Sequence, residues 1–107
     1  MKSAWIFLCL AGLLEIGWPV GLKIAQTPGR VLAGVALAVV CMGLSGWFLW
    51  LAQKGIPIGT AYAVWTGIGA TGTFLIGVAF YGDPSGLLRW LAIFLIISGI
   101  VLLKLAH

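Results

Sequence analysis

Glu15 is the residue with the clearest chemical potential in this sequence, because it lies alone within an apolar run that covers about Ala4 to Leu22. If this run crosses a membrane, an ionised carboxylate near its centre costs at least a few kcal/mol, so such acids usually face a protein interior or a water pathway. The sequence has no basic residue at a matching depth, and we therefore expect the carboxylate to exchange partners. A structural hydrogen bond between helices is the alternative.

A carboxyl group shielded from water holds its proton to higher pH than one in water, and a second acid beside it strengthens this effect. Such a group can bind a proton or a cation, but it cannot bind both fully. This competition is the minimum requirement for exchanging a cationic substrate against protons.

Trp18 and Pro19 share the helix face of Glu15, since they follow it by three and four residues. Trp18 lies deeper than the tryptophans near segment ends, and we expect its indole N–H to donate to Glu15, with packing as the alternative. Pro19 has no N–H, so the Glu15 carbonyl loses its regular helical partner. A bend or a re-bonded carbonyl is therefore predicted beside the acid.

The third apolar run is rich in small and polar groups between Gly59 and Gly72, and Tyr62, Trp65 and Gly69 share one of its faces. Gly67 and Gly69 permit close helix approach and a bend, which would suit a hinge between two conformations; a rigid packed contact is the alternative.

Small or polar residues also interrupt the second and fourth runs. The Ser45 hydroxyl could bond back to its own helix or point toward a cavity. On the fourth run, the spacing of Ala92, Leu95, Ile96 and Gly99 favours helix–helix contact, and we assign it to dimerisation.

The composition requires these residues to be carried by membrane-spanning helices. Hydrophobic residues make up 63% of the 107 residues and charged residues 7%, against roughly 25% charged in soluble domains. Each crossing needs about 20 apolar residues. The sequence predicts an all-α membrane protein with a single four-helix transmembrane domain over 1–107, whose helices cover about 4–22, 31–52, 58–80 and 87–105. A cleaved signal peptide is the alternative for the first run, but Glu15 would interrupt its apolar core.

The basic residues are scattered singly at segment ends, which argues against a nucleic-acid partner. Lys and Arg are normally in excess on the cytoplasmic side, yet here the two sides carry equal numbers. We therefore expect insertion in both orientations and an antiparallel homodimer, with one fixed orientation as the alternative. The two sets are Lys2, Lys54 and Lys104 against Lys23, Arg30 and Arg89.

Nothing in the sequence predicts an enzyme, a cofactor or a metal site. Cys9 and Cys41 lie within apolar runs and are expected to pack as small hydrophobic residues. The single histidine is His107, and no nucleophile–base pair or phosphate-binding loop is evident.

Several segments closely resemble the small multidrug resistance (SMR) family, and the resemblance covers the whole chain. Within that family, Trp18, Thr66-Gly67-Ile68-Gly69 and Lys104 look like the guanidinium exporter (Gdx, or SugE) subtype, whereas drug-exporting relatives typically have Gly at the Trp18 position. The resembling segments are Leu13-Leu14-Glu15-Ile16-Gly17-Trp18, Gly21-Leu22-Lys23, the stretch 57–69 and the stretch 98–104.

The resemblance implies an antiparallel homodimer in the bacterial inner membrane that exports guanidinium and small substituted guanidinium cations in exchange for protons. Both copies of Glu15 would bind substrate and proton, and four residues would surround or orient them: Trp18, Ser45, Tyr62 and Trp65. Pro19, where the subtype usually has a small residue, and the lack of an aromatic residue near Arg30 are departures. A broader quaternary ammonium exporter and a non-transporting assembly subunit are the competing functions.

Overall fold

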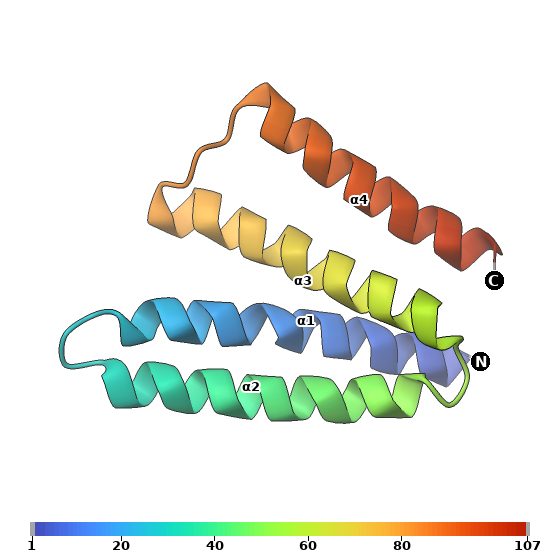
Figure 1. Cartoon of the computed structure of the whole chain (residues 1–107), viewed down its shortest axis with the longest axis horizontal. Helices are drawn as coiled ribbons and strands as arrows, with labels where there is room; N and C mark the ends of the chain where they lie inside the picture. The colour runs from blue at the N-terminus through green and yellow to red at the C-terminus, as the bar shows by residue number, and fades with distance from the viewer. Residues whose placement is uncertain (1, 107) are drawn as a thin grey trace.

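The computed structural model describes residues 2–106, with side chains from residue 3 onward. It contains α1 (Lys2–Ala25), α2 (Val31–Ala52), α3 (Ile58–Tyr81) and α4 (Leu87–Ala106), and within this range no strand is formed (Figure 1). The expectations that rest on the Lys2 side chain and on His107 lie outside the described residues.

All four helices are long and apolar enough to cross a membrane. Large apolar side chains face outward along them, with Leu87, Phe80 and Leu105 exposed at 87%, 78% and 76%. Exposing such side chains to water would oppose the hydrophobic effect, whereas hydrocarbon tails accommodate them. The predicted all-α membrane fold with four spanning helices is therefore confirmed.

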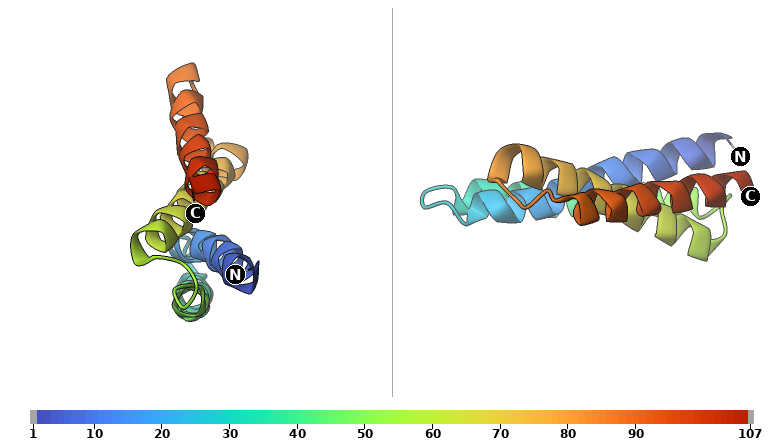
Figure 2. Two further views of the ribbon diagram at one scale, coloured as in Figure 1. Left: turned by 90° about the vertical axis from the view of Figure 1, so that its right-hand side faces the viewer. Right: turned by 90° about the horizontal axis from the view of Figure 1, so that it is seen from above.

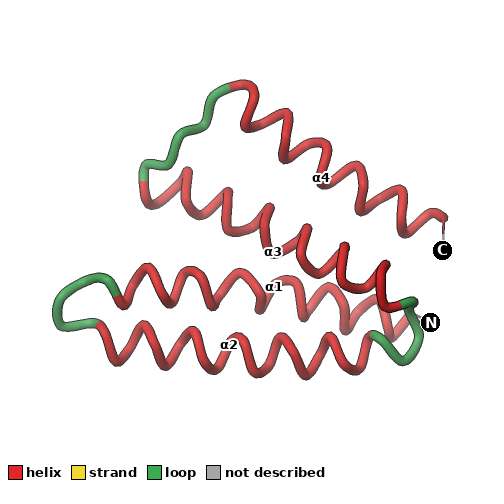
Figure 3. The backbone as a smooth tube through the Cα atoms, in the orientation of Figure 1, coloured by secondary structure: helices red, strands yellow, loops and turns green. Residues whose placement is uncertain are grey.

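The helices form an open array rather than a closed bundle. α1 pairs with the antiparallel α2 on one side and with α3 on the other, and the backbone of α4 comes close, among the described helices, only to α3. Figure 1 and Figure 2 show α4 diverging from the α1–α2 pair, and Figure 3 shows the loops at alternating ends of the array. α1 and α3 therefore run in the same direction, which aligns their successive turns.

Two glycines bring the backbones of α1 and α2 into contact near the first loop. A Cβ atom added to Gly34 would lie 2.5 Å from the Gly21 carbonyl oxygen and would also meet the Ala25 amide nitrogen. A Cβ atom on Gly21 would lie 2.7 Å from the Gly34 carbonyl oxygen. Glycine at both positions thus permits an approach that any side chain would prevent.

A small apolar core fixes α1 against α2 and α3 at the opposite end of the array. Its buried members come from the start of α1, the end of α2, the second loop and the start of α3, and they are Ala4, Leu8, Ala52, Ile56, Ala61 and Val64. The glycine contact at one end and this core at the other hold the middle of α1, where Glu15 lies, in a fixed position.

Basic residues at the helix ends lie over aromatic rings. Lys54 Nζ is 4.3 Å from the centroid of the Trp50 ring, and Lys104 Nζ is 4.8 Å from that of Trp5. These pairs match the aromatic and basic anchors found where membrane helices meet the lipid headgroups.

α1 continues as one helix across Pro19. Proline inside a helix removes one backbone hydrogen bond without necessarily ending the helix, because neighbouring helices support it. A break is thereby excluded, and the bend expected beside Glu15 stays a prediction.

Candidate functional site: the Glu15 carboxylate between α1 and α3

The side chain of Glu15 lies directly against the backbone of α3. A Cβ atom added to Gly69 would be 2.5 Å from Glu15 Cγ and 3.2 Å from Glu15 Cβ. Gly69 is buried and Glu15 is half-buried. The carboxylate is therefore held at the α1–α3 contact, and glycine at position 69 is what makes room for its stem.

Trp18 is the hydrogen-bond partner of Glu15. Its indole N–H donates to the carboxylate from one helical turn further along α1. The structure thus has the contact that the sequence spacing suggested, and the ring of Trp18 occupies space beside the acid.

Ser45 connects three helices at a fully buried position. Its hydroxyl donates to the Ala11 carbonyl oxygen at 2.7 Å, and it accepts a hydrogen bond from Trp65 Nε1 at 2.8 Å. The hydroxyl therefore bonds to the neighbouring helix α1. This differs from both sequence-based expectations, which were a bond within its own helix and a direction toward a cavity.

This chain of hydrogen bonds ends next to the acid. Ala11 precedes Glu15 by four residues, so its carbonyl is also the regular helical acceptor for the Glu15 N–H. A carbonyl oxygen can accept two hydrogen bonds. Trp65 and Ser45 thus fix the turn of α1 that carries Glu15, without contacting its carboxylate in the structure.

Tyr62 joins this group through Trp65. Their ring centroids are 5.6 Å apart with an angle of 55° between the planes. Tyr62 is 58% exposed, so most of its surface is open on the outside of this single chain. The orienting role predicted for Tyr62 stays a prediction.

Gly67 and Gly69 pack on different neighbours. A Cβ atom on Gly67 would lie 2.7 Å from Ile100 Cδ1 and 3.3 Å from Ile96 Cγ2 on α4, whereas Gly69 meets Glu15 on α1. α3 is therefore closely contacted on two sides at this level, as the packing alternative expects. The hinge role of these glycines stays a prediction.

The residues assigned to dimerisation differ in their surroundings. Ala92 and Leu95 are exposed, Leu95 at 61%, and a Cβ atom on Gly99 would meet nothing within 4 Å. Ile96 is turned partly toward α3, where it lies against Gly67. Within the part of the chain that the structure describes, three of the four predicted contact residues therefore leave room for a second copy to pack against them. The dimer contact itself stays a prediction.

The two cysteines differ in their surroundings. Cys41 Sγ fills the space beside Gly17 in the α1–α2 contact, as a packing role requires, and Cys9 is exposed. Among the described residues, no three His, Cys, Asp or Glu side chains gather into a possible metal site.

Sequence reasoning missed three groups near the site. The Ala11 carbonyl could not be found, because an alanine gives no signal of what its backbone accepts. Thr71 Oγ1 is buried and has no hydrogen-bond partner in the described part of the chain. Asp83 borders a cavity between α1 and α3, and its only signal was that the chain has two acidic residues.

Four spanning helices with one carboxylate held between them define a small multi-pass membrane protein with an intramembrane acidic site. The model of the family described as Small Multidrug Resistance protein matches residues 3–96, and the chain belongs to that family. It is a membrane transporter rather than an enzyme.

Curated relatives match nearly the full chain. A guanidinium exporter of Yersinia pseudotuberculosis is 47% identical over 103 residues, covering 96% of this chain and 98% of the relative. The guanidinium exporter of Proteus vulgaris is 45% identical over the same shares of both chains. That of Escherichia coli strain K12 is 42% identical over 106 residues, covering 96% of this chain and 97% of the relative.

Proposed function

We propose that this protein is a proton-coupled antiporter that exports guanidinium and small substituted guanidinium cations across the bacterial inner membrane. The observation that carries the proposal is the Glu15 carboxylate held at the α1–α3 contact, with Trp18 as its hydrogen-bond donor. The relatives named as guanidinium exporters support the choice of substrate.

The chemistry of guanidinium suits this site. The cation is planar and permanently charged, and its paired N–H groups match the two oxygens of a carboxylate. The aromatic faces of Trp18 and Trp65 are suited to cover a flat cation. A protonated Glu15 no longer attracts the cation, so protons and substrate compete for one group and exchange follows from that competition.

The proposal includes an antiparallel homodimer with two copies of Glu15. One chain by itself leaves the backbone of α4 close only to α3 among the described helices, and it leaves Tyr62 and Leu95 largely exposed. The equal numbers of basic residues on the two sides support insertion in both orientations. A second copy would cover the open face and close a cavity that four helices cannot enclose.

The hydrogen bonds around Glu15 suggest how the site keeps its geometry. Trp18 holds the carboxylate directly, while Trp65 and Ser45 hold the preceding turn of α1 through the Ala11 carbonyl. A binding group needs to be fixed within about 0.5 Å to act well. We therefore assign positioning roles to Ser45 and Trp65 and a binding role to Glu15.

Transport into proteoliposomes tests the proposal. With an acidic interior, wild-type protein should accumulate radiolabelled guanidinium, and a protonophore should abolish the accumulation. Raising the external pH should increase the apparent affinity for guanidinium, because fewer protons then occupy Glu15. Glu15→Gln should reduce uptake to the level of empty vesicles, since an amide neither titrates nor carries charge.

The outcomes separate the competing functions. Uptake that is unchanged in Glu15→Gln would contradict the proposed site, whereas wild-type uptake no higher than that of empty vesicles would favour a subunit that only assembles with partners. Strong competition by bulky quaternary ammonium ions would favour a broader cation exporter. Reporter fusions to the C-terminus that show a single orientation would remove the antiparallel dimer.

A further inference from the structure

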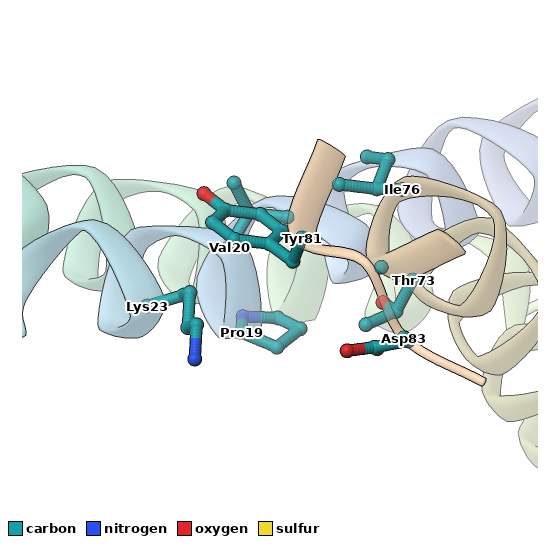
Figure 4. Close-up of a pocket in the computed structure, with 8 residues that line it drawn as sticks. Pro19, Val20, Lys23, Thr73, Ile76, Tyr81 and Asp83 are labelled. Atoms are coloured by element: carbon teal, nitrogen blue, oxygen red, sulfur yellow. The ribbon is translucent and has the colours of Figure 1, made fainter. Parts of the chain in front are cut away.

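A cavity of about 180 Å³ lies between α1 and α3, at the end of the array where both helices finish. Its polar lining comes from Lys23 on α1, Thr73 and Tyr81 on α3, and Asp83 in the third loop, while Pro19 forms an apolar wall (Figure 4). None of these polar groups is used by the Glu15 site described above.

The cavity begins one helical turn beyond Glu15. Pro19 follows Glu15 by four residues on α1, and Thr73 follows Gly69, the contact residue of Glu15, by four residues on α3. Since a helix rises 1.5 Å per residue, both walls start about 6 Å from the Glu15–Gly69 contact. The cavity therefore lies between the intramembrane carboxylate and the loop end of the array.

The backbone holds Asp83 over this cavity. α3 ends at Tyr81 and is capped by Gly82, which has a φ of 67° in the left-handed region, and the Asp83 N–H donates to the Gly77 carbonyl oxygen at 3.1 Å. This is the pattern of a glycine-terminated helix. The Asp83 carboxylate occupies the place where Gly77 would carry a Cβ atom. Figure 4 shows the carboxylate directed toward Pro19.

The charge of Asp83 is available to a ligand. The nearest described cation on the cavity wall is Lys23, and its Nζ lies 5.7 Å from the centroid of the Tyr81 ring. Among the side chains that the structure describes, none forms a salt bridge with Asp83. The cavity thus combines a free carboxylate, a hydroxyl and an aromatic ring, which together suit a small cation with N–H donors.

We propose that this cavity is an outer binding site, in which Asp83 holds the transported cation on its way between the solvent and Glu15. The inference rests on the proposed function, because it takes the same cation as ligand. Lys23 acts as a competitor, because its ammonium group can itself pair with Asp83. In an antiparallel dimer, each membrane face would carry one such cavity.

Initial rates of guanidinium uptake in proteoliposomes, measured over a range of concentrations, test this inference. Asp83→Asn should raise KM by roughly two- to fivefold, the range of one exposed ion pair, and leave the maximal rate nearly unchanged. Gly77→Ala keeps the charge but fills the place of the carboxylate, and it should raise KM similarly. Lys23→Gln should lower KM, and this gain should vanish when Asp83→Asn is also present.

Arg89→Gln is the matched control. Arg89 lies at the same end of the array but over the Phe74 ring, 5.5 Å from its centroid, and outside the cavity. It should leave KM unchanged. An equal fall of KM in Lys23→Gln and Arg89→Gln would assign the effect to general surface charge and overturn the outer site.

Wild-type and Glu15→Gln protein in the same assay separate the two proposals. If uptake depends on Glu15 while Asp83→Asn keeps the wild-type KM, the proposed function stands and the outer site is overturned. If wild-type uptake does not depend on Glu15, the proposed function fails, and the outer site fails with it.

Discussion

Replacing Gly69 with alanine tests whether the backbone of α3 positions Glu15. The added Cβ atom would lie 2.5 Å from Glu15 Cγ, whereas ordinary contact begins at 3.4 Å, so the atoms must separate by about 0.9 Å. A misplacement of about 1 Å in a group that acts on a substrate can lower the rate by roughly 10²-fold. Because rotation of the glutamate stem absorbs part of the shift, we expect a loss of roughly 10- to 100-fold.

The assay compares initial rates of guanidinium uptake under a fixed pH gradient. Gly59→Ala is the control, since it makes the same change on the same helix at a position where a Cβ atom meets nothing within 4 Å. Gly59→Ala should transport at the wild-type rate. Size-exclusion chromatography should show that both variants keep the wild-type assembly, which separates a misplaced Glu15 from a misfolded protein.

Equal transport by Gly69→Ala and Gly59→Ala, with both correctly assembled, would refute the reasoning. It would mean that Glu15 acts from a position that does not depend on its contact with α3. A loss of transport in both variants would instead show that α3 needs glycine for flexibility along its length, as a hinge would, and not for the close approach at Gly69.

Two further predictions concern the contacts that hold α1. Gly34→Ala should lower the free energy of unfolding in detergent by about 1–3 kcal/mol, because its Cβ atom would meet the backbone nitrogen of Ala25, which cannot rotate away. Gly43→Ala is the control, since a Cβ atom there has open space. Equal melting temperatures for the two variants would contradict this prediction. Ser45→Ala should cost about 1–3 kcal/mol, because the Trp65 N–H loses its acceptor. Combined with Trp65→Phe in a double-mutant cycle of thermal unfolding, the two changes should be non-additive, and strict additivity would show that the Trp65–Ser45 bond does not stabilise the fold.

The helices and Glu15 could be predicted because both are recognised from the order of residues along the chain. An uninterrupted apolar run of about 20 residues has few structures other than a spanning helix, and the runs 31–52 and 58–80 correspond closely to α2 and α3. α1 extends beyond its run at both ends, to Lys2 and Ala25, because helical hydrogen bonding does not stop where the apolar residues stop. Glu15 was evident from its cost in such a run.

The faces of the helices could not be predicted in the same way. In water, the buried face of a helix is marked by apolar residues, but each helix here is apolar nearly all round, so its pattern does not separate lipid from protein. Ile96 illustrates the difficulty: its spacing with Gly99 favoured a dimer contact, yet it lies partly against Gly67 of α3. Small residues predict that another helix packs closely at their position, but they do not indicate which helix it is.

The sequence by itself determined that this protein spans the membrane and carries a carboxylate there, because hydrophobic length and the cost of charge depend on the order of residues alone. Only the tertiary structure decided that Glu15 lies against Gly69, that Ser45 joins Trp65 to the Ala11 carbonyl, and that Asp83 borders a cavity one turn from the acid. The contacts of Glu15 with Gly69 and of Ser45 with Ala11 and Trp65 join residues 20 or more positions apart. They follow from the way the helices pack, with α1 and α3 parallel. This packing is set by the fit of the helix surfaces, and it produces no repeating pattern in the sequence.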